Sequence, residues 1–192
     1  ETVLSEEISR TFKELQNMSP RPEIIEILML RFDVHNLKVL FKAKYLEIKA
    51  ELLLSSGTLP LPKLQEAVAA LDFREFPPRL RPVAEQIAGE FEINRDSQLI
   101  DLILDRFLFT ELIYASREVR SVFLEEFFQK QIDLTNIKTF IRVQRIGRDR
   151  EFLKKVLLPH GRLAPELFTG LLGDSLDTLV RELAMSAYGP LV

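Results

Sequence analysis

Apolar residues recur at helical spacing along three long stretches of this chain. From Asp33 to Leu52 they fall three or four residues apart, with lysines and glutamates between them, which is the pattern of an amphipathic helix. The same spacing returns over residues 97–131 and over residues 134–156. Runs that alternate polar and β-branched residues are missing, as are the Asn-Gly and Asp-Gly pairs of hairpin turns. The pattern predicts an all-α fold, a multi-helix bundle of about eight helices with short connections.

One short motif occurs twice, at an offset of 100 residues. The sequence FDVHNLK at residues 32–38 corresponds to IDLTNIK at residues 132–138. After each copy we expect a glycine that ends the preceding helix and a proline that begins the next one. These residues are Gly57 and Pro62 after the first copy, and Gly161 and Pro165 after the second. The chain is therefore predicted to contain at least two similar helical repeats.

The Asp-x-x-Asn core of the motif has a simple structural interpretation. An Asp just before a helix accepts hydrogen bonds from the unpaired N–H groups of the first turn, and a polar residue three positions later can reach back. Asp33 and Asn36, and likewise Asp133 and Asn136, are therefore predicted to be helix caps. Contact with a partner is the alternative role for the same residues.

The residue types that carry common catalytic and metal sites are scarce. Because the chain has no cysteine, disulfides, thiolate metal sites and cysteine nucleophiles are excluded. The two histidines, His35 and His160, lack the spacing of the Glu-x-x-His and His-Glu-x-x-His metal motifs. The seven glycines form no phosphate-binding or dinucleotide-binding loop. We therefore expect no metal, no cofactor and no small-molecule substrate.

Acidic side chains on the second long stretch offer an enzymatic alternative. Asp101, Asp105 and Glu111 would suit a helical hydrolase if they converged in a pocket with raised pKa values. A solvated stripe, or ion pairs with Arg106 and Arg117, explains the same residues without any reaction. We favour this second interpretation and expect no catalytic residue.

The distribution of charge suggests a contact surface. The chain carries 26 Lys and Arg against 29 Asp and Glu, a net charge of −3, which argues against a protein that coats nucleic acid. Basic residues nevertheless gather on the two motif helices, and five of them are predicted to contact an acidic partner or lipid headgroups. These are Lys38, Lys42, Lys138, Arg142 and Arg145. A solvated helix face is the plainer alternative.

The first residues and the apolar runs of the chain give an expectation for its location. No stretch reaches the roughly 18 consecutive apolar residues of a membrane span. The first residues are acidic and lack the basic and then apolar pattern of a secretory signal. We therefore expect an intracellular protein.

Three segments together resemble the C subunit of archaeal and bacterial V/A-type rotary ATPases, the counterpart of the d subunit in eukaryotic V-ATPases. They are the two motif copies, the second extended through Arg142, and LDRFLFTEL at residues 104–112. The resemblance covers nearly the whole chain. It implies an all-α funnel with pseudo-threefold repeats and a non-catalytic rotor component of a proton- or sodium-transporting complex. Such a protein joins the central stalk to the membrane proteolipid ring from the cytoplasmic side, as a peripheral protein.

The resemblance also divides the chain. Residues 1–88 are expected to form one helical repeat, and residues 89–192 a second repeat with the start of a third lobe, the lobes sharing helices. Members of this family are considerably longer. Since a missing lobe would leave apolar surface uncovered, we expect the protein to self-associate more readily than full-length members. A generic helical scaffold that binds an acidic protein partner is the alternative function.

Overall fold

The computed structural model describes residues 2–191, with side chains for residues 6–93 and 95–190. Over this range the secondary structure consists of nine α-helices and one 3₁₀-helix, without any strand. The all-α prediction is therefore confirmed for the described part of the chain. The chain separates into two compact units, Glu1–Arg120 and Ser121–Val192, each with its own cluster of buried apolar side chains.

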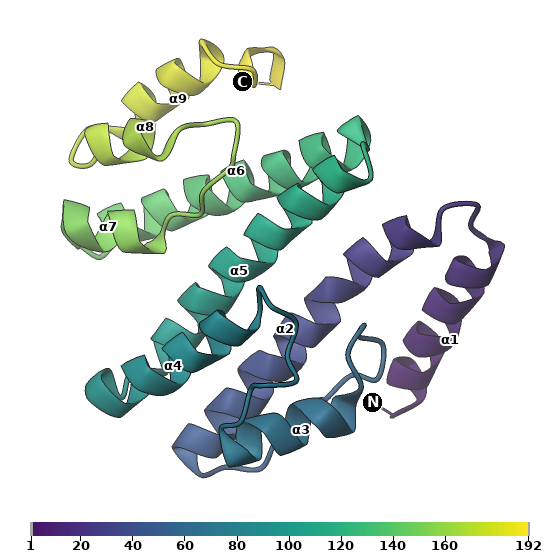
Figure 1. Ribbon diagram of the computed structural model, residues 1–192. Coiled ribbons are helices and arrows are strands. Elements are labelled where there is room, and N and C mark those ends of the chain that lie inside the picture. The colour runs from purple at the N-terminus through teal and green to yellow at the C-terminus, as the bar shows by residue number, and fades with distance from the viewer. Residues whose placement is uncertain (1, 192) are drawn as a thin grey trace. The chain divides into compact units, whose positions relative to one another are not determined.

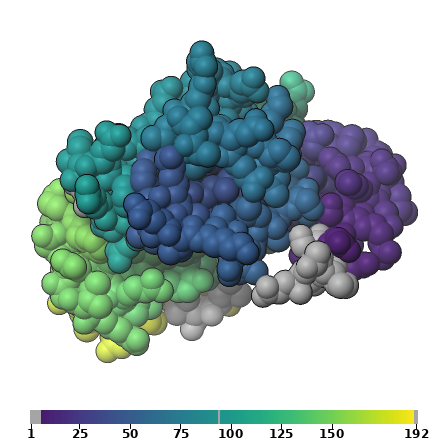
Figure 2. All heavy atoms as spheres, turned by 90° about the horizontal axis from the view of Figure 1, so that it is seen from below, coloured from purple at the N-terminus to yellow at the C-terminus, as the bar shows by residue number. Residues whose placement is uncertain are grey.

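The first unit is organised around two long helices, α2 (Pro22–Leu46) and α5 (Ser97–Glu118). They lie side by side and run in opposite directions (Figure 1). Helices α1 (Thr2–Met18) and α3 (Leu61–Ala70) pack against α2, and α4 (Arg81–Asn94) packs against α5. Two parts of the first unit are exposed on the face that Figure 2 shows, where they are coloured blue. They are the segment after α2 and helix α3 itself. The core includes the fully buried side chains of Leu37, Phe41, Leu64, Ile87, Ile100 and Leu104.

The second unit is built on α6 (Val122–Arg145). Helices α7 (Arg150–Val156) and α8 (Pro165–Gly170) pack against it, and α9 (Leu176–Ala184) and a 3₁₀-helix (Gly189–Leu191) follow. Phe140 of α6 contacts Phe168 of α8 with their ring centroids 5.9 Å apart. Both rings are fully buried, and they form the centre of this core with Leu153.

The first compact unit extends to Arg120, and the division into helical repeats between residues 88 and 89 stays a prediction. Residues 89–120 belong to the first unit, since α5 packs against α2 and α4 within it. The apolar stretch over residues 97–131 is accordingly two helices. Arg120 has a left-handed backbone, with φ of 52°, and the Ser121 side chain accepts a hydrogen bond from the Leu124 N–H at the start of α6. A turn and a helix cap therefore divide a pattern that is continuous in the sequence.

Candidate functional site

Each Asn of the repeated motif pairs with the backbone of a distant loop. Asn36 donates from Nδ2 to the Leu54 carbonyl at 2.7 Å and accepts at Oδ1 from the Leu54 N–H at 2.8 Å. Asn136 makes the same two bonds with Leu158, at 2.9 and 2.8 Å. A side-chain amide suits this double pairing because it carries a donor and an acceptor side by side.

Each Asp of the motif accepts hydrogen bonds from the same loop, a few residues further on. Asp33 accepts from the N–H groups of Thr58 and Leu59 at 2.9 and 3.0 Å, and from the Thr58 hydroxyl at 2.6 Å. Asp133 accepts from the N–H groups of Arg162 and Leu163 at 3.0 and 3.1 Å. Its third donor is a tyrosine from the end of the unit, Tyr188, whose hydroxyl lies 2.7 Å away.

The prediction that these four residues cap their own helices is wrong. Asp33 and Asn36 lie in the middle of α2, and Asp133 and Asn136 lie in the middle of α6. All four are buried, with at most 4% of their surface exposed. Buried polar groups need hydrogen-bond partners. The loop before α3 supplies them in the first unit, and the loop before α8 together with Tyr188 supplies them in the second. We call Asp33 with Asn36 the first Asp–Asn site and Asp133 with Asn136 the second.

A glycine allows the loop to approach each Asp. A Cβ atom built on Gly57 would lie 2.1 Å from Asp33 Oδ1, and one on Gly161 would lie 2.1 Å from Asp133 Oδ1. The expectation that these glycines end helices is therefore wrong, since α2 ends at Leu46 and α7 at Val156. The expectation for the prolines is confirmed, because Pro62 and Pro165 lie in the first turns of α3 and α8.

Sequence reasoning missed the partners of the Asp–Asn sites, Tyr188 above all. The glycine that recurs after both copies was the one available signal, since a fixed glycine marks a close approach as well as a turn. Tyr188 stands outside the repeated pattern. No sequence signal connects it to Asp133.

Burial is the largest influence on the pKa values of Asp33 and Tyr188. The pKa of Asp33 is raised above its usual value by burial, and the hydrogen bonds from Thr58 and Leu59 oppose that shift. The pKa of Tyr188 is raised, first by burial and next by its hydrogen bond to Asp133. The tyrosine hydroxyl therefore stays protonated at neutral pH and remains a donor. Both sites fasten a loop to the middle of a long helix.

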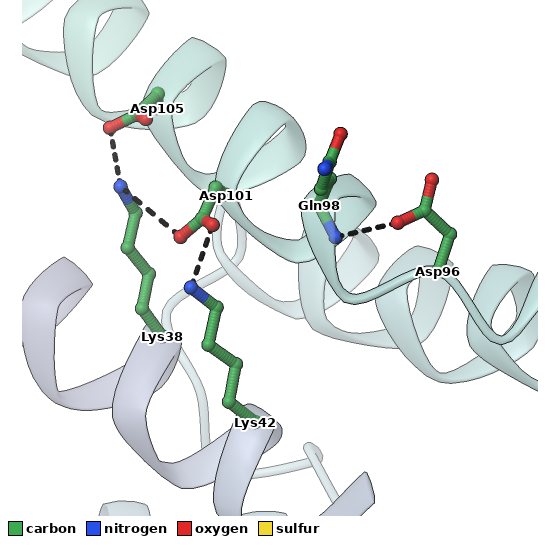
Figure 3. Close-up of polar contacts among 6 residues, drawn as sticks. All are labelled: Lys38, Lys42, Asp96, Gln98, Asp101 and Asp105. Atoms are coloured by element: carbon green, nitrogen blue, oxygen red, sulfur yellow. Dashed lines mark hydrogen bonds and ion pairs between the residues drawn. The ribbon is translucent and has the colours of Figure 1, made fainter. Parts of the chain in front are cut away.

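Two of the lysines predicted to contact a partner are engaged inside the first unit. Lys38 lies 2.6 Å from Asp105, and Lys42 lies 2.6 Å from Asp101 (Figure 3). Lys38 also lies 3.9 Å from Asp101. The two lysines of α2 and the two aspartates of α5 thus form a ladder across the antiparallel helix pair, so these lysines do not present free charge to a partner.

We expect the Lys38–Asp105 pair to contribute about 0.5–1 kcal/mol of coupling energy, since the pair is only partly shielded from water. The test is a double-mutant cycle with Lys38→Gln, Asp105→Asn and their combination, followed by urea unfolding. The more exposed pair of Lys63 and Glu75 is the matched control and should give a smaller coupling. Equal coupling in the two cycles would contradict this expectation.

The acidic residues considered for catalysis do not converge. Asp101 and Asp105 face the lysines of α2, whereas Glu111 lies 3.5 Å from Arg79. Burial raises the pKa of Glu111, against the effect of Arg79. A hollow of about 410 Å³ over α3 is lined by none of these three residues. The arrangement gives no support to a hydrolase.

Metal binding and membrane insertion also lack support in the described residues. Among them, no group of three or more His, Cys, Asp or Glu side chains is placed to hold a metal ion. None of the helices that the structure describes is long and apolar enough to cross a membrane.

The remaining three predicted contact residues form a row on α6. Lys138, Arg142 and Arg145 are spaced four and three residues apart, so they lie on one face of the helix. All three are exposed. Within the part of the chain that the structure describes, their side chains have no ion-pair or hydrogen-bond partner. We call Lys138, Arg142 and Arg145 the basic row. It is a candidate for contact with an acidic surface.

Comparison with known proteins shows which family and which individual proteins the chain is similar to. The family model described as "ATP synthase (C/AC39) subunit" matches residues 1–192. The chain is 28% identical over 193 aligned residues to the C subunit of the V-type sodium ATPase of Enterococcus hirae, covering all of this chain and 59% of that protein. It is 27% identical to the C subunit of the A-type ATP synthase of Thermococcus gammatolerans, covering 98% of this chain and 53% of that protein.

A third relative is the C subunit of the A-type ATP synthase of a Desulfurococcus species, 26% identical over all of this chain and 54% of its own length. The chain thus spans between 53% and 59% of the length of these relatives. No solved structure matches the chain significantly.

Proposed function

Because the chain belongs to the ATP synthase (C/AC39) subunit family, we propose that it is a non-catalytic rotor adaptor of a V/A-type ATPase. In this role it couples the central stalk to the proteolipid ring of a proton- or sodium-translocating complex. The observation that carries the proposal is the family match over all 192 residues. The names of the relatives, which are components of a sodium ATPase and of ATP synthases, support it.

The geometry agrees with an adaptor that transmits force without chemistry. Long helices are joined by an ion-pair ladder in the first unit, and a loop is fastened to the middle of the longest helix in each unit through an Asp–Asn site. The Asp–Asn sites resist bending because buried, satisfied hydrogen bonds are costly to open. The proposed location is the cytoplasmic surface of the membrane, as a peripheral protein.

We propose the basic row of α6 as the contact with the ring or the stalk. Its three exposed cations have no acidic partner within the described residues, so a partner with acidic groups would gain their charge without breaking an existing pair. The alternative function is a helical scaffold for an acidic protein partner outside any ATPase. The basic row also supports this alternative, since its cations would attract any acidic protein.

The proposed contact predicts a specific loss of binding. Arg142→Glu should weaken capture of either the stalk proteins or the detergent-solubilised ring of the ATPase from the same organism by at least about tenfold, since one reversal replaces attraction by repulsion. The measurement is a pull-down with the purified protein as bait. Arg150→Glu is the matched control, because Arg150 is exposed on α7 outside the row, and it should bind like the wild type.

Two results would count against this assignment. Equal losses for Arg142→Glu and Arg150→Glu would mean that the overall charge of the protein matters and the row does not. Capture of neither stalk nor ring by the wild-type protein would contradict the adaptor function and favour the scaffold.

We also propose that the isolated chain self-associates at high concentration. Large apolar side chains are exposed on the second unit, among them Phe123 and Met185, each with 76% of its surface exposed. Large exposed apolar side chains favour association, because contact between copies of the chain removes them from water. Sedimentation velocity should show a mass that rises with concentration, and a single monomeric species up to about 10 mg/ml would contradict the proposal.

A further inference from the structure

The two motif helices carry matching basic residues in different surroundings. Lys138 of α6 occupies the repeat position of Lys38 of α2, and Arg142 occupies that of Lys42. In the first unit these positions are covered by α5, which supplies Asp101 and Asp105 four residues apart. In the second unit no described residue pairs with the side chain of Lys138 or of Arg142.

The apolar residue one turn earlier shows the same difference. Val34 of α2 precedes Lys38 by four residues and has 3% of its surface exposed. Leu134 of α6 precedes Lys138 by four residues and has 56% of its surface exposed. Four-residue spacing places each apolar residue on the same face as the cation that follows it. This face of α6 therefore combines an uncovered leucine with uncovered cations, where α2 has a buried valine and paired lysines.

The next position of the repeat, Phe41 and Ile141, packs against the core in both units. Phe41 of α2 is fully buried, whereas its counterpart Ile141 is half-buried. The Asp–Asn sites, by contrast, are buried in both units, and each Asn makes the same two hydrogen bonds with its loop. The two helices thus share the face that holds the loop and differ at the face that α5 covers in the first unit.

We propose that the face of α6 formed by Leu134, Lys138 and Arg142 binds an acidic α-helix of a partner polypeptide. The helix lies antiparallel to α6, as α5 lies against α2. It presents two carboxylates one turn apart to Lys138 and Arg142, and an apolar residue to Leu134. Figure 3 shows the arrangement of the first unit that serves as the template.

Charge complementarity and spacing favour a helix over an anionic membrane as the occupant. The cations are few and regularly spaced, and the row continues into an apolar side chain in the middle of the helix. A lipid surface needs a cluster of basic residues and sets no spacing between them. A helix with carboxylates four residues apart matches the separation of Lys138 and Arg142.

The proposal can be tested with the helix that covers the equivalent face of the first unit, α5. The probe is a synthetic peptide with the sequence of residues 97–118, fused to a soluble carrier protein because the sequence is rich in apolar residues. The matched control peptide carries Asp101→Asn and Asp105→Asn, which keep the shape and remove the charge. The wild-type protein should bind the acidic probe at least about tenfold more tightly than the control, as measured by fluorescence anisotropy.

Variants of the protein locate the binding on α6. The combined substitution Lys138→Gln and Arg142→Gln should reduce binding of the acidic probe by about tenfold, to the level of the control peptide. Arg150→Gln on α7 should leave binding unchanged. A charge-swapped pair gives a positive result that misfolding cannot produce. The protein with Lys138→Glu and Arg142→Glu should prefer a probe in which Asp101 and Asp105 are replaced by lysine.

Several results would overturn the proposal. The first is equal affinity of the protein for the acidic and the control probe, and the second is no effect of the α6 substitutions on probe binding. The third is a protein that does not bind the probe but binds vesicles of anionic lipid, with this vesicle binding abolished by the α6 substitutions. The proposal rests on the proposed function in one respect, because both assign a binding role to the cations of α6. Since the peptide assay contains no other ATPase component, its failure leaves the stalk and ring pull-down unaffected, and the reverse also holds.

Discussion

Replacing Gly161 by alanine is expected to lower the free energy of unfolding by about 2–4 kcal/mol. The added Cβ would lie 2.1 Å from Asp133 Oδ1 and 3.1 Å from Ile132 Cγ2. Neither neighbour can move freely. The Asp133 carboxylate is fully buried and held by the N–H groups of Arg162 and Leu163, so relief of the clash must break these bonds or displace the loop.

Urea unfolding followed by circular dichroism measures this effect, and another glycine provides the control. Gly89 lies inside α4, and a Cβ there would meet nothing within 4 Å. Gly89→Ala should therefore stabilise the protein by about 0.5–1 kcal/mol, as alanine does inside helices. A Gly161→Ala variant as stable as the wild type would contradict the close approach of loop and carboxylate.

The second large effect is expected from Asn136→Asp, which should cost about 2–4 kcal/mol at pH 7. The Asn136 amide both donates to the Leu158 carbonyl and accepts from the Leu158 N–H. A carboxylate can only accept, so one oxygen would face the carbonyl oxygen and the negative charge would be buried. The matched control is Asn17→Asp on the exposed surface of α1, which should change stability by at most about 0.5 kcal/mol.

The pH dependence of the same variant tests the physical reason. Burial raises the pKa of the introduced carboxyl in the folded state, so the folded protein binds a proton that the unfolded chain does not. The stability of Asn136→Asp relative to the wild type should therefore rise as the pH falls from 7 through that folded-state pKa. A protonated carboxyl regains both a donor and an acceptor. A stability difference that is constant between pH 7 and pH 4 would contradict this reason.

The sequence contains enough information to predict the helices and the repetition of one motif. Helical periodicity is a local property, and so is the match between residues 32–38 and 132–138. Neither periodicity nor the motif match shows where each motif lies within its helix. An Asp before a helix and an Asp inside one look alike in sequence when the partner of the second lies about 25 residues away, as Thr58 does from Asp33.

The candidate contact residues show the same limit. Lys38 and Lys138 have equivalent sequence environments, which predict the same contact with a partner for both. Only the fold shows that α5 pairs Lys38 with Asp105, while Lys138 is exposed and unpaired among the described residues. Long-range pairing between helices decides which charges are available, and periodicity carries no information about it.

The adaptor function is tested most directly by asking whether the protein links two assemblies that do not bind each other by themselves. Stalk proteins are incubated with ring immobilised in detergent, with and without the purified protein, and the stalk retained on the ring is quantified. We predict retention that depends on the protein and that falls with Lys138→Glu and Arg142→Glu. Equal retention of the stalk in the presence and absence of the protein would contradict the adaptor function.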